Sequence, residues 1–194
     1  MIIKKSELKL INSNHPTLYL EPEPFNFKGD ADATMLCNIM FEKMKELGGV
    51  GLSANQLGLN IRMFVMGIDS ELIEVFNPKI LNTGLETVSL SEGCLSFPGI
   101  NLMVRRPERV TASFQDRRGV ETIKEFEGLT ARIFLHEYDH MQGKIFREHV
   151  STLKWNLAVK RRNHIKNKLV KKYSQKTLID IYNEVKNAEN TDRV

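Results

Sequence analysis

Apolar residues recur every three or four positions in three stretches of this chain, and this period predicts amphipathic helices. The stretches cover about residues 30–47, 128–143 and 152 onward. Asp30 or Asp32 can cap the start of the first, and glycines follow the ends of the first two. One helix is therefore expected before the middle of the chain and two after it.

Strand patterns fill the interval between the first two predicted helices, where apolar and β-branched residues cluster or alternate with polar ones. The expected strands cover residues 61–68, 72–76, 86–90, 109–114 and 120–126; Asn77-Pro78 is expected to end the second of these, and Asp116-Arg117-Arg118-Gly119 predicts a hairpin turn. Strands grouped in this way indicate an α+β fold rather than a repeating βαβ unit. We expect mostly antiparallel sheets packed around the second helix, with an N-terminal helix and a basic C-terminal helix.

Composition is that of an ordinary globular protein, with 194 residues, 41% hydrophobic and 27% charged. This length predicts one domain over residues 1–173, including the helix from about 152, followed by a short, partly frayed extension over 174–194. Neither a membrane-spanning run nor a secretory signal is recognisable, and two cysteines are too few for a disulfide framework. We therefore expect a cytoplasmic, monomeric protein with no membrane and no DNA partner.

Positive charge is concentrated near the C-terminal end. Residues 154–172 contain eight Lys or Arg and no Asp or Glu, so the rest of the chain carries four net negative charges although the whole carries +4. Two interpretations remain open for this stretch. It is either a solvated amphipathic helix or an electrostatic contact to ribosomal RNA, close to the point where nascent chains emerge.

A His-Glu-x-x-His pattern lies in the second predicted helix, at His136, Glu137 and His140. Two histidines four residues apart project from one helix face and can bind the same metal ion. Glu137 lies beside that ion, where a general base for water belongs. A surface helix that carries the pattern by chance is the alternative, and a third ligand would decide between them.

Cys94 is the candidate for that third ligand, because it follows a predicted strand in a tight turn between Gly93 and Ser96. A Cys-His-His set leaves the fourth metal position for water, which is the arrangement of a catalytic site. Cys37 is instead expected to be a packing residue. The loop 49–56 is rich in small residues and allows close backbone approach, either to a ligand or in a plain tight turn, and it lacks the features of a phosphate loop.

Three motifs in this order resemble the peptide deformylase family over about residues 7–157: Gly-x-Gly-x-(Ser/Ala)-Ala-x-Gln, Glu-Gly-Cys-Leu-Ser and His-Glu-x-x-His. The resemblance implies removal of the formyl group from the formyl-methionine of nascent polypeptides. It implies one divalent metal, Fe(II) in the family with Zn, Ni or Co able to replace it. In this sequence Cys94, His136 and His140 would hold the metal and Glu137 would be the general base and acid. The Gln56 amide and the Leu95 backbone N–H would stabilise the oxyanion.

Two positions depart from the family pattern: Ser53 replaces the usual alanine, and Asn101 stands where well-known bacterial members have a basic residue. A methionine slot is expected beside the metal, lined by Val50, Leu95, Leu129 and Ile133, with Gly51 as a further substrate contact. Glu92 is expected to pair with Arg106. Asp139 could orient a histidine ring or pair with a basic neighbour, and His149 is expected to be an ordinary surface or loop residue.

Two rival functions are compatible with part of this pattern. A zinc metallopeptidase shares His-Glu-x-x-His, but it takes its third ligand from His, Glu or Asp and not from Cys94. A non-catalytic RNA- or ribosome-binding protein with a structural metal would need neither Gln56 nor Glu137. The motif set therefore favours a deformylase-like metallohydrolase.

Overall fold

The computed structural model describes residues 8–29, 32–68 and 71–173. The chain divides into two compact units, residues 1–151 and 152–194. The boundary lies at the start of the last helix, earlier than the expected boundary after residue 173. The assignment of residues 1–173 to one domain stays a prediction.

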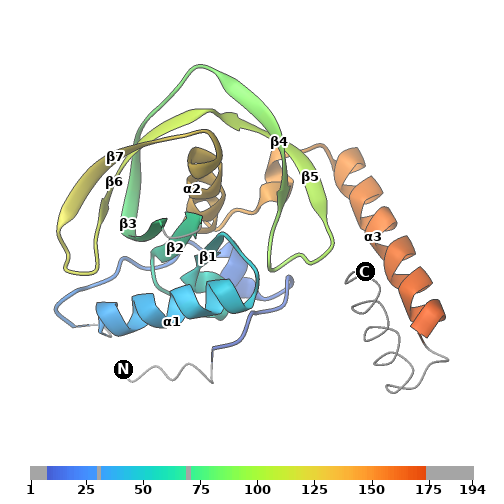
Figure 1. Ribbon diagram of the computed structural model, residues 1–194, viewed down its shortest axis with the longest axis horizontal. Helices are drawn as coiled ribbons and strands as arrows, with labels where there is room; N and C mark the ends of the chain where they lie inside the picture. Colours follow the sequence, from blue (N-terminus) through green and yellow to red (C-terminus); the bar gives the residue numbers. More distant parts are fainter. Residues whose placement is uncertain (1–7, 30–31, 69–70, 174–194) are drawn as a thin grey trace, which may run out of the picture. The chain divides into compact units, whose positions relative to one another are not determined.

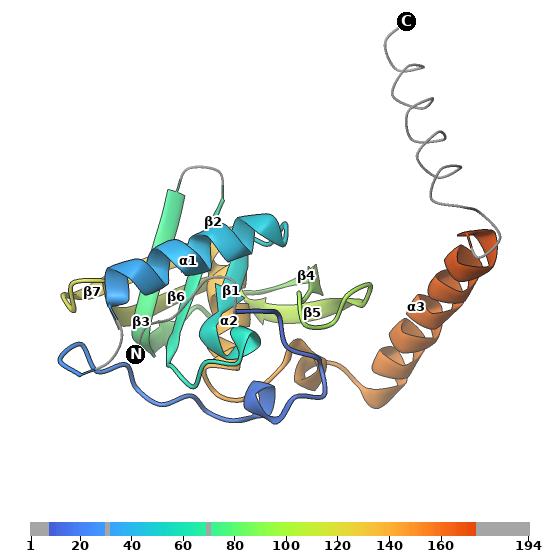
Figure 2. The same cartoon turned by 90° about the horizontal axis from the view of Figure 1, so that it is seen from below.

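The first unit is an α+β fold with antiparallel sheets, as predicted (Figure 1). Its larger sheet has the order β1-β2-β3-β6-β7, and all four strand pairs are antiparallel. The smaller sheet pairs β4 with β5, and it lies on the opposite side of α2 from β7 (Figure 2). The strands are β1 (Gly51–Ser53), β2 (Met63–Ile68), β3 (Glu71–Thr83), β4 (Thr87–Gly93), β5 (Asn101–Pro107), β6 (Arg109–Gln115) and β7 (Glu121–Glu127).

Two helices cover the larger sheet, α1 (Ala33–Glu46) and α2 (Gly128–His140). Alternation along β2 places Met63 and Val65 in the cluster of buried residues that includes α1, whereas Phe64 and Met66 belong to the cluster around α2. Successive side chains of a strand point to opposite faces, so the two helices pack on opposite faces of the sheet. The His-Glu-x-x-His segment therefore lies on a helix whose apolar side is fixed by the core.

The N-terminal helix and the hairpin turn follow the sequence prediction. Asp32 caps α1, and its Oδ1 accepts hydrogen bonds from the N–H groups of Thr34 at 2.8 Å and Met35 at 3.1 Å. Asp30 lies outside the described residues. Cys37 is fully buried as expected, and this burial raises the pKa of its thiol to about 12.

Three strand predictions were wrong or incomplete. β3 continues through Asn77-Pro78 to Thr83 instead of ending there, because the ladder with β6 shifts register between Phe76 and Lys79. Asn77 takes φ +49° at this bulge, and its side chain bonds the backbone of Phe25 and the side chain of Gln115. β5 and the short β1 were not predicted from the sequence.

Among the described residues, short 3-10 helices connect the larger elements: η2 (Pro16–Tyr19), η3 (Ala54–Leu57) and η4 (Phe146–His149). In the second unit, α3 (Thr152–Tyr173) begins at the predicted residue, and none of its side chains is buried. The expected frayed extension over 174–194 lies outside the described residues. Within the described part of the chain, no helix is both long and apolar enough to cross a membrane.

Candidate metal centre and active site

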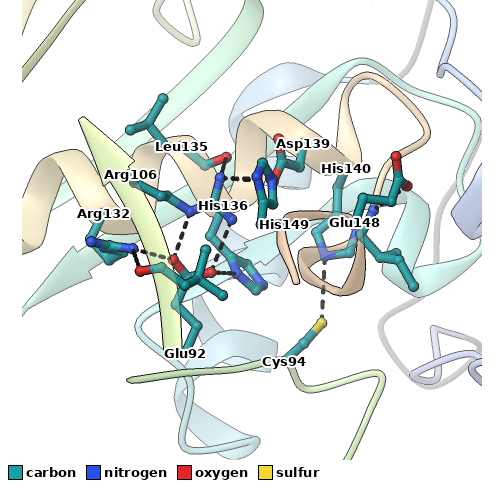
Figure 3. Close-up of polar contacts among 12 residues, drawn as sticks. Glu92, Cys94, Arg106, Arg132, Leu135, His136, Asp139, His140, Glu148 and His149 are labelled. Atoms are coloured by element: carbon teal, nitrogen blue, oxygen red, sulfur yellow. Dashed lines mark hydrogen bonds and ion pairs between the residues drawn. The ribbon is translucent and has the colours of Figure 1, made fainter. Parts of the chain in front are cut away.

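The three predicted ligands converge where the end of β4 meets α2. Cys94 directly follows β4, and His136 and His140 lie one helical turn apart on α2. One ligand atom from each of the three lies within 4.8 Å of the others, and Cys94 Sγ is 3.5 Å from His140 Nε2 (Figure 3). Ligands bound to a tetrahedral metal at 2.0 to 2.3 Å are about 3.5 Å apart. The donor atoms and their spacing therefore fit one metal ion.

The two histidines have opposite electrostatic environments. Burial lowers the pKa of His136, but hydrogen bonds with Cys94 and Glu92 and the charge of Glu137 outweigh it and raise the pKa to about 10. Burial and the charge of His136 lower the pKa of His140 to about 3. His140 is therefore held in the neutral form, in which an imidazole can bind a metal, while the groups around His136 favour its protonated form.

Glu92 orients His136 from behind. Its Oε2 lies 3.0 Å from His136 Nδ1, so the other ring nitrogen is directed at the site. Arg106 binds both carboxylate oxygens, with Nε 2.6 Å from Oε1 and Nη2 2.9 Å from Oε2, which confirms the predicted ion pair. Arg132 Nη1 donates to Oε1 at 2.8 Å. Burial raises the pKa of Glu92, but the His136 and Arg106 bonds outweigh it and hold that pKa well below its usual range.

Arg132 was missed by the sequence analysis, although a signal for it was present. It precedes His136 by four residues, as His136 precedes His140, so all three project from one side of α2. A buried arginine on the face that carries metal ligands needs a carboxylate partner. Glu92 in the cysteine motif supplies it.

Asp139 makes both of the contacts that the sequence left open. Its Oδ2 is 2.8 Å from Arg106 Nη1 and 2.7 Å from His149 Nε2 (Figure 3). His149 lies at the surface, as expected, but it is also part of the polar network behind the site, a role that was not predicted from the sequence. η4, which ends at His149, was not recognised in the sequence, and so no pattern placed this side chain near α2.

Glu137 packs against Gly51 at the start of β1. Glu137 is 4% exposed, and a Cβ atom at Gly51 would lie 2.4 Å from its Oε1. Burial raises the pKa of Glu137 to about 7, although the nearby charges of His136 and Arg106 oppose this. A carboxyl group with this pKa can both accept and release a proton at neutral pH.

Gln56 is held with its amide N–H groups toward the cysteine. Its Oε1 accepts from the backbone N–H of Ser53 at 3.0 Å, and its Nε2 is 3.4 Å from Cys94 Sγ and 3.2 Å from Ser96 Oγ. The Ser53 hydroxyl, which replaces the usual alanine, is satisfied by Asn55 Oδ1 at 2.8 Å. Thus Ser53 is compatible with the site and helps to fix the amide.

A pocket of about 400 Å³ lies beside Cys94 and His136, and every residue predicted to contact the substrate lines it. Ile133 is 5% exposed and lies deep, whereas Val50 (48%) and Leu129 (54%) are exposed at its edge. Gly51 and Leu95 also line the pocket. Its lining further includes Phe97, Ile100, Asn101 and Arg132, which were not predicted from the sequence to form the methionine slot. The surface of the pocket is mainly apolar, and Gln56, Cys94, His136 and Glu137 are among its lining residues.

Known proteins resemble this chain in sequence and in fold. A family model described as polypeptide deformylase matches residues 7–156. A peptide deformylase from Thermotoga maritima is 37% identical over 139 residues, which cover 72% of this chain and 84% of that protein. A solved peptide deformylase from Legionella pneumophila has a TM-score of 0.75 at 34% identity, covering 84% of this chain and 97% of that one. A Synechococcus elongatus peptide deformylase solved in complex with actinonin has a TM-score of 0.75 at 31% identity, covering 80% and 86%.

Proposed function

This chain belongs to the polypeptide deformylase family, and from that membership and the site geometry we propose that it removes the N-terminal formyl group from formyl-methionine of nascent polypeptides. The reaction breaks the formyl C–N bond with water and releases formate and a free amine. The observation that carries the proposal is the convergence of Cys94, His136 and His140 beside a buried Glu137 and an apolar pocket.

Cys94, His136 and His140 would hold a divalent metal, which would supply Lewis acidity and make water an effective nucleophile at neutral pH. Glu137 accepts the proton of the attacking water and returns it to the departing amine. The Nε2 amide of Gln56 and the backbone N–H of Leu95 donate hydrogen bonds to the oxygen on which negative charge develops, and each such donor contributes about 3 kcal/mol. Ser53 keeps the Gln56 amide in that orientation.

Fe(II) is the metal that we propose, with Zn, Ni or Co as functional replacements. A thiolate gives the ion more electron density than a third imidazole, and the pair of Fe(II) and Cys94 is sensitive to oxygen. Purification with and without oxygen, followed by metal analysis, tests this assignment. Equal iron content and equal activity in both preparations would contradict it.

The decisive assay is formate release from formyl-Met-Ala-Ser by protein purified without oxygen. Glu137→Ala is the matched control, because it removes the proposed base and leaves all three ligands in place. We expect activity in the wild type and a loss of at least about 100-fold in the variant at equal metal content. Absence of formate from the metal-loaded wild type would refute the proposal, and cleavage of the Met-Ala bond instead would identify a metallopeptidase.

We propose that the methionine slot lies in this pocket, between α2 and the start of β1. Its walls would be formed by Val50, Gly51, Leu129 and Ile133. Ile133→Ala should raise KM for formyl-Met peptides with less effect on kcat, because it removes apolar contact from the bound side chain. Ile123→Ala, at an exposed isoleucine on β7, is the control. An unchanged KM in Ile133→Ala would exclude Ile133 from the slot.

For α3, we propose a contact with ribosomal RNA, made by a monomeric cytoplasmic enzyme that meets its substrate as chains emerge. Residues 154–172 supply eight positive charges without an acidic residue, and no described side chain of α3 is buried. Co-sedimentation with ribosomes should weaken with added salt and when Arg161, Arg162, Lys166 and Lys168 are replaced by glutamine. Binding without salt dependence would end this proposal and leave α3 a solvated helix.

A further inference from the structure

The guanidinium group of Arg106 is a buried junction between two carboxylates. It lies on β5 and is 3% exposed. One edge, Nε and Nη2, binds Glu92, and the remaining nitrogen, Nη1, lies 2.8 Å from Asp139 Oδ2 and 3.4 Å from the carbonyl oxygen of Leu135. The planar guanidinium fixes the directions of these bonds relative to one another, so a rotation that loses one contact disturbs the others.

His149 closes this junction on its outer side. Its Nε2 lies 2.7 Å from Asp139 Oδ2 and 3.3 Å from Arg106 Nη1. A contact of 2.7 Å between a ring nitrogen and a carboxylate oxygen requires a hydrogen on the nitrogen, because two acceptors would repel each other. Nε2–H therefore donates to Asp139, and Arg106 Nη1 donates to the same carboxylate from the other side.

We propose that His149 is a positioning residue for the metal centre: its bond to Asp139 holds Arg106 in the orientation that fixes Glu92, and Glu92 in turn orients His136. This inference rests on the proposed metal site but not on the identity of the substrate. The chain of contacts joins η4, α2, β5 and β4 and returns to the ligand face of α2 (Figure 3). His149 is the outermost member, with its side chain 33% exposed, whereas Asp139 is 14% exposed and Glu92 4%.

Loss of His149 would leave Asp139 Oδ2 with one fewer donor and open its outer side to water. Arg106 Nη1 would then be free to turn toward the carbonyl of Leu135, and the two hydrogen bonds from Arg106 to Glu92 would weaken. Loss of a direct partner of a ligating histidine costs about 10- to 100-fold in metal affinity. Since His149 acts through three intervening groups, we expect a smaller effect, about 3- to 10-fold.

The test uses the full chain loaded with Co(II), whose visible spectrum reports on the geometry of the ligands. The variants are His149→Ala and His149→Gln, and the matched control is His164→Ala at an exposed histidine on α3, in the other compact unit. The measurements are the Co(II) spectrum, the rate of Co(II) loss to a chelator, and the Tm of each metal-free variant. We expect His149→Ala to lose Co(II) about 3- to 10-fold faster with a shifted spectrum. His149→Gln keeps an N–H donor and should recover most of the difference.

Coupling to Asp139 provides the second measurement. If His149 acts through Asp139, His149→Ala should add little to the rate of Co(II) loss from an Asp139→Asn variant, because the effects of interacting residues are not additive.

The inference is overturned if His149→Ala matches His164→Ala in spectrum and in the rate of Co(II) loss, or if His149→Gln is as impaired as His149→Ala. It is also overturned if the effects of His149→Ala and Asp139→Asn are additive. If His149→Ala does not fold, His149→Gln decides the question. Loss of Co(II) from His149→Gln at the wild-type rate supports the bond between His149 and Asp139, and loss as fast as in Asp139→Asn overturns the inference. Failure of the wild type to bind Co(II) would overturn the metal site itself, whereas loss of deformylase activity alone would not affect this inference.

Discussion

Gly51→Ala should displace the proposed general base. The three atoms nearest to a Cβ at this position all belong to Glu137, at 2.4 Å for Oε1 and 2.9 Å for Cδ and Cγ. Real Cβ atoms essentially never show contacts below 3.0 Å, so Oε1 must move from 2.4 to at least 3.0 Å, a shift of 0.6 Å. Because Glu137 is only 4% exposed, it has little room in which to move.

The size of the effect follows from that displacement. A misplacement of about 1 Å at a reacting group costs up to about 100-fold in rate, so kcat for formyl-Met peptides should fall about 10- to 100-fold. Overpacking at a buried position costs about 1 to 3 kcal/mol of unfolding free energy. Metal content should stay unchanged, because Gly51 contacts the base and none of the ligands is displaced directly.

A double-mutant cycle separates this contact from other effects of the substitution. In a Glu137→Ala background the clash is gone, and Gly51→Ala should become neutral or stabilising by up to about 1 kcal/mol, because alanine restricts the unfolded chain. Unfolding free energies come from denaturant titrations of the four proteins, and kcat from formate release. An equal stability loss in both backgrounds, or unchanged kcat in Gly51→Ala, would refute the reasoning.

Three further predictions concern the polar network, the general base and the bulge in β3. Glu92→Gln removes the carboxylate charge that pairs with Arg132 and one of the two that pair with Arg106, so unfolding free energy should fall by about 3 to 5 kcal/mol and metal affinity by about 10- to 100-fold; a wild-type Tm would contradict this. Burial raises the pKa of Glu137 from the ordinary 4.5 to about 7, so the folded metal-free protein keeps this proton between about pH 4.5 and 7 while the unfolded chain releases it. Its contribution to stability should therefore decline as pH rises through that window, and metal-free Glu137→Gln should lack this decline in denaturant titrations. Asn77 takes φ +49°. Asn77→Gly and Asn77→Ala lose the same hydrogen bonds, but only alanine is strained at this φ, so the unfolding free energy of Asn77→Gly should fall by about 1 kcal/mol less. Equal losses of unfolding free energy would show that backbone strain is unimportant there.

Local patterns were sufficient for much of the fold. The helix periods located α1, α2 and α3, and the turn at residues 116–119 was recognised from its aspartate and glycine. The end of β3 could not be predicted in this way. Asn77-Pro78 normally interrupts a strand, and only the bulge against β6 and the side-chain bonds of Asn77 allow the ladder to continue. Those partners are far away in the sequence, and no local rule contains them.

The sequence by itself determined the residue types on which the proposed chemistry depends. A helical period of 3.6 residues places His136 and His140 on one face, and the residues at positions 94 and 137 have the donor chemistry of the proposed third ligand and general base. Tertiary structure alone decided how these groups are held. Glu92 contacts His136 across 44 residues of sequence, Gly51 leaves room for the carboxyl group of Glu137, and His149 reaches Asp139 from a separate short helix. Donor chemistry is a property of single residues, whereas orientation and burial arise only when distant segments pack together.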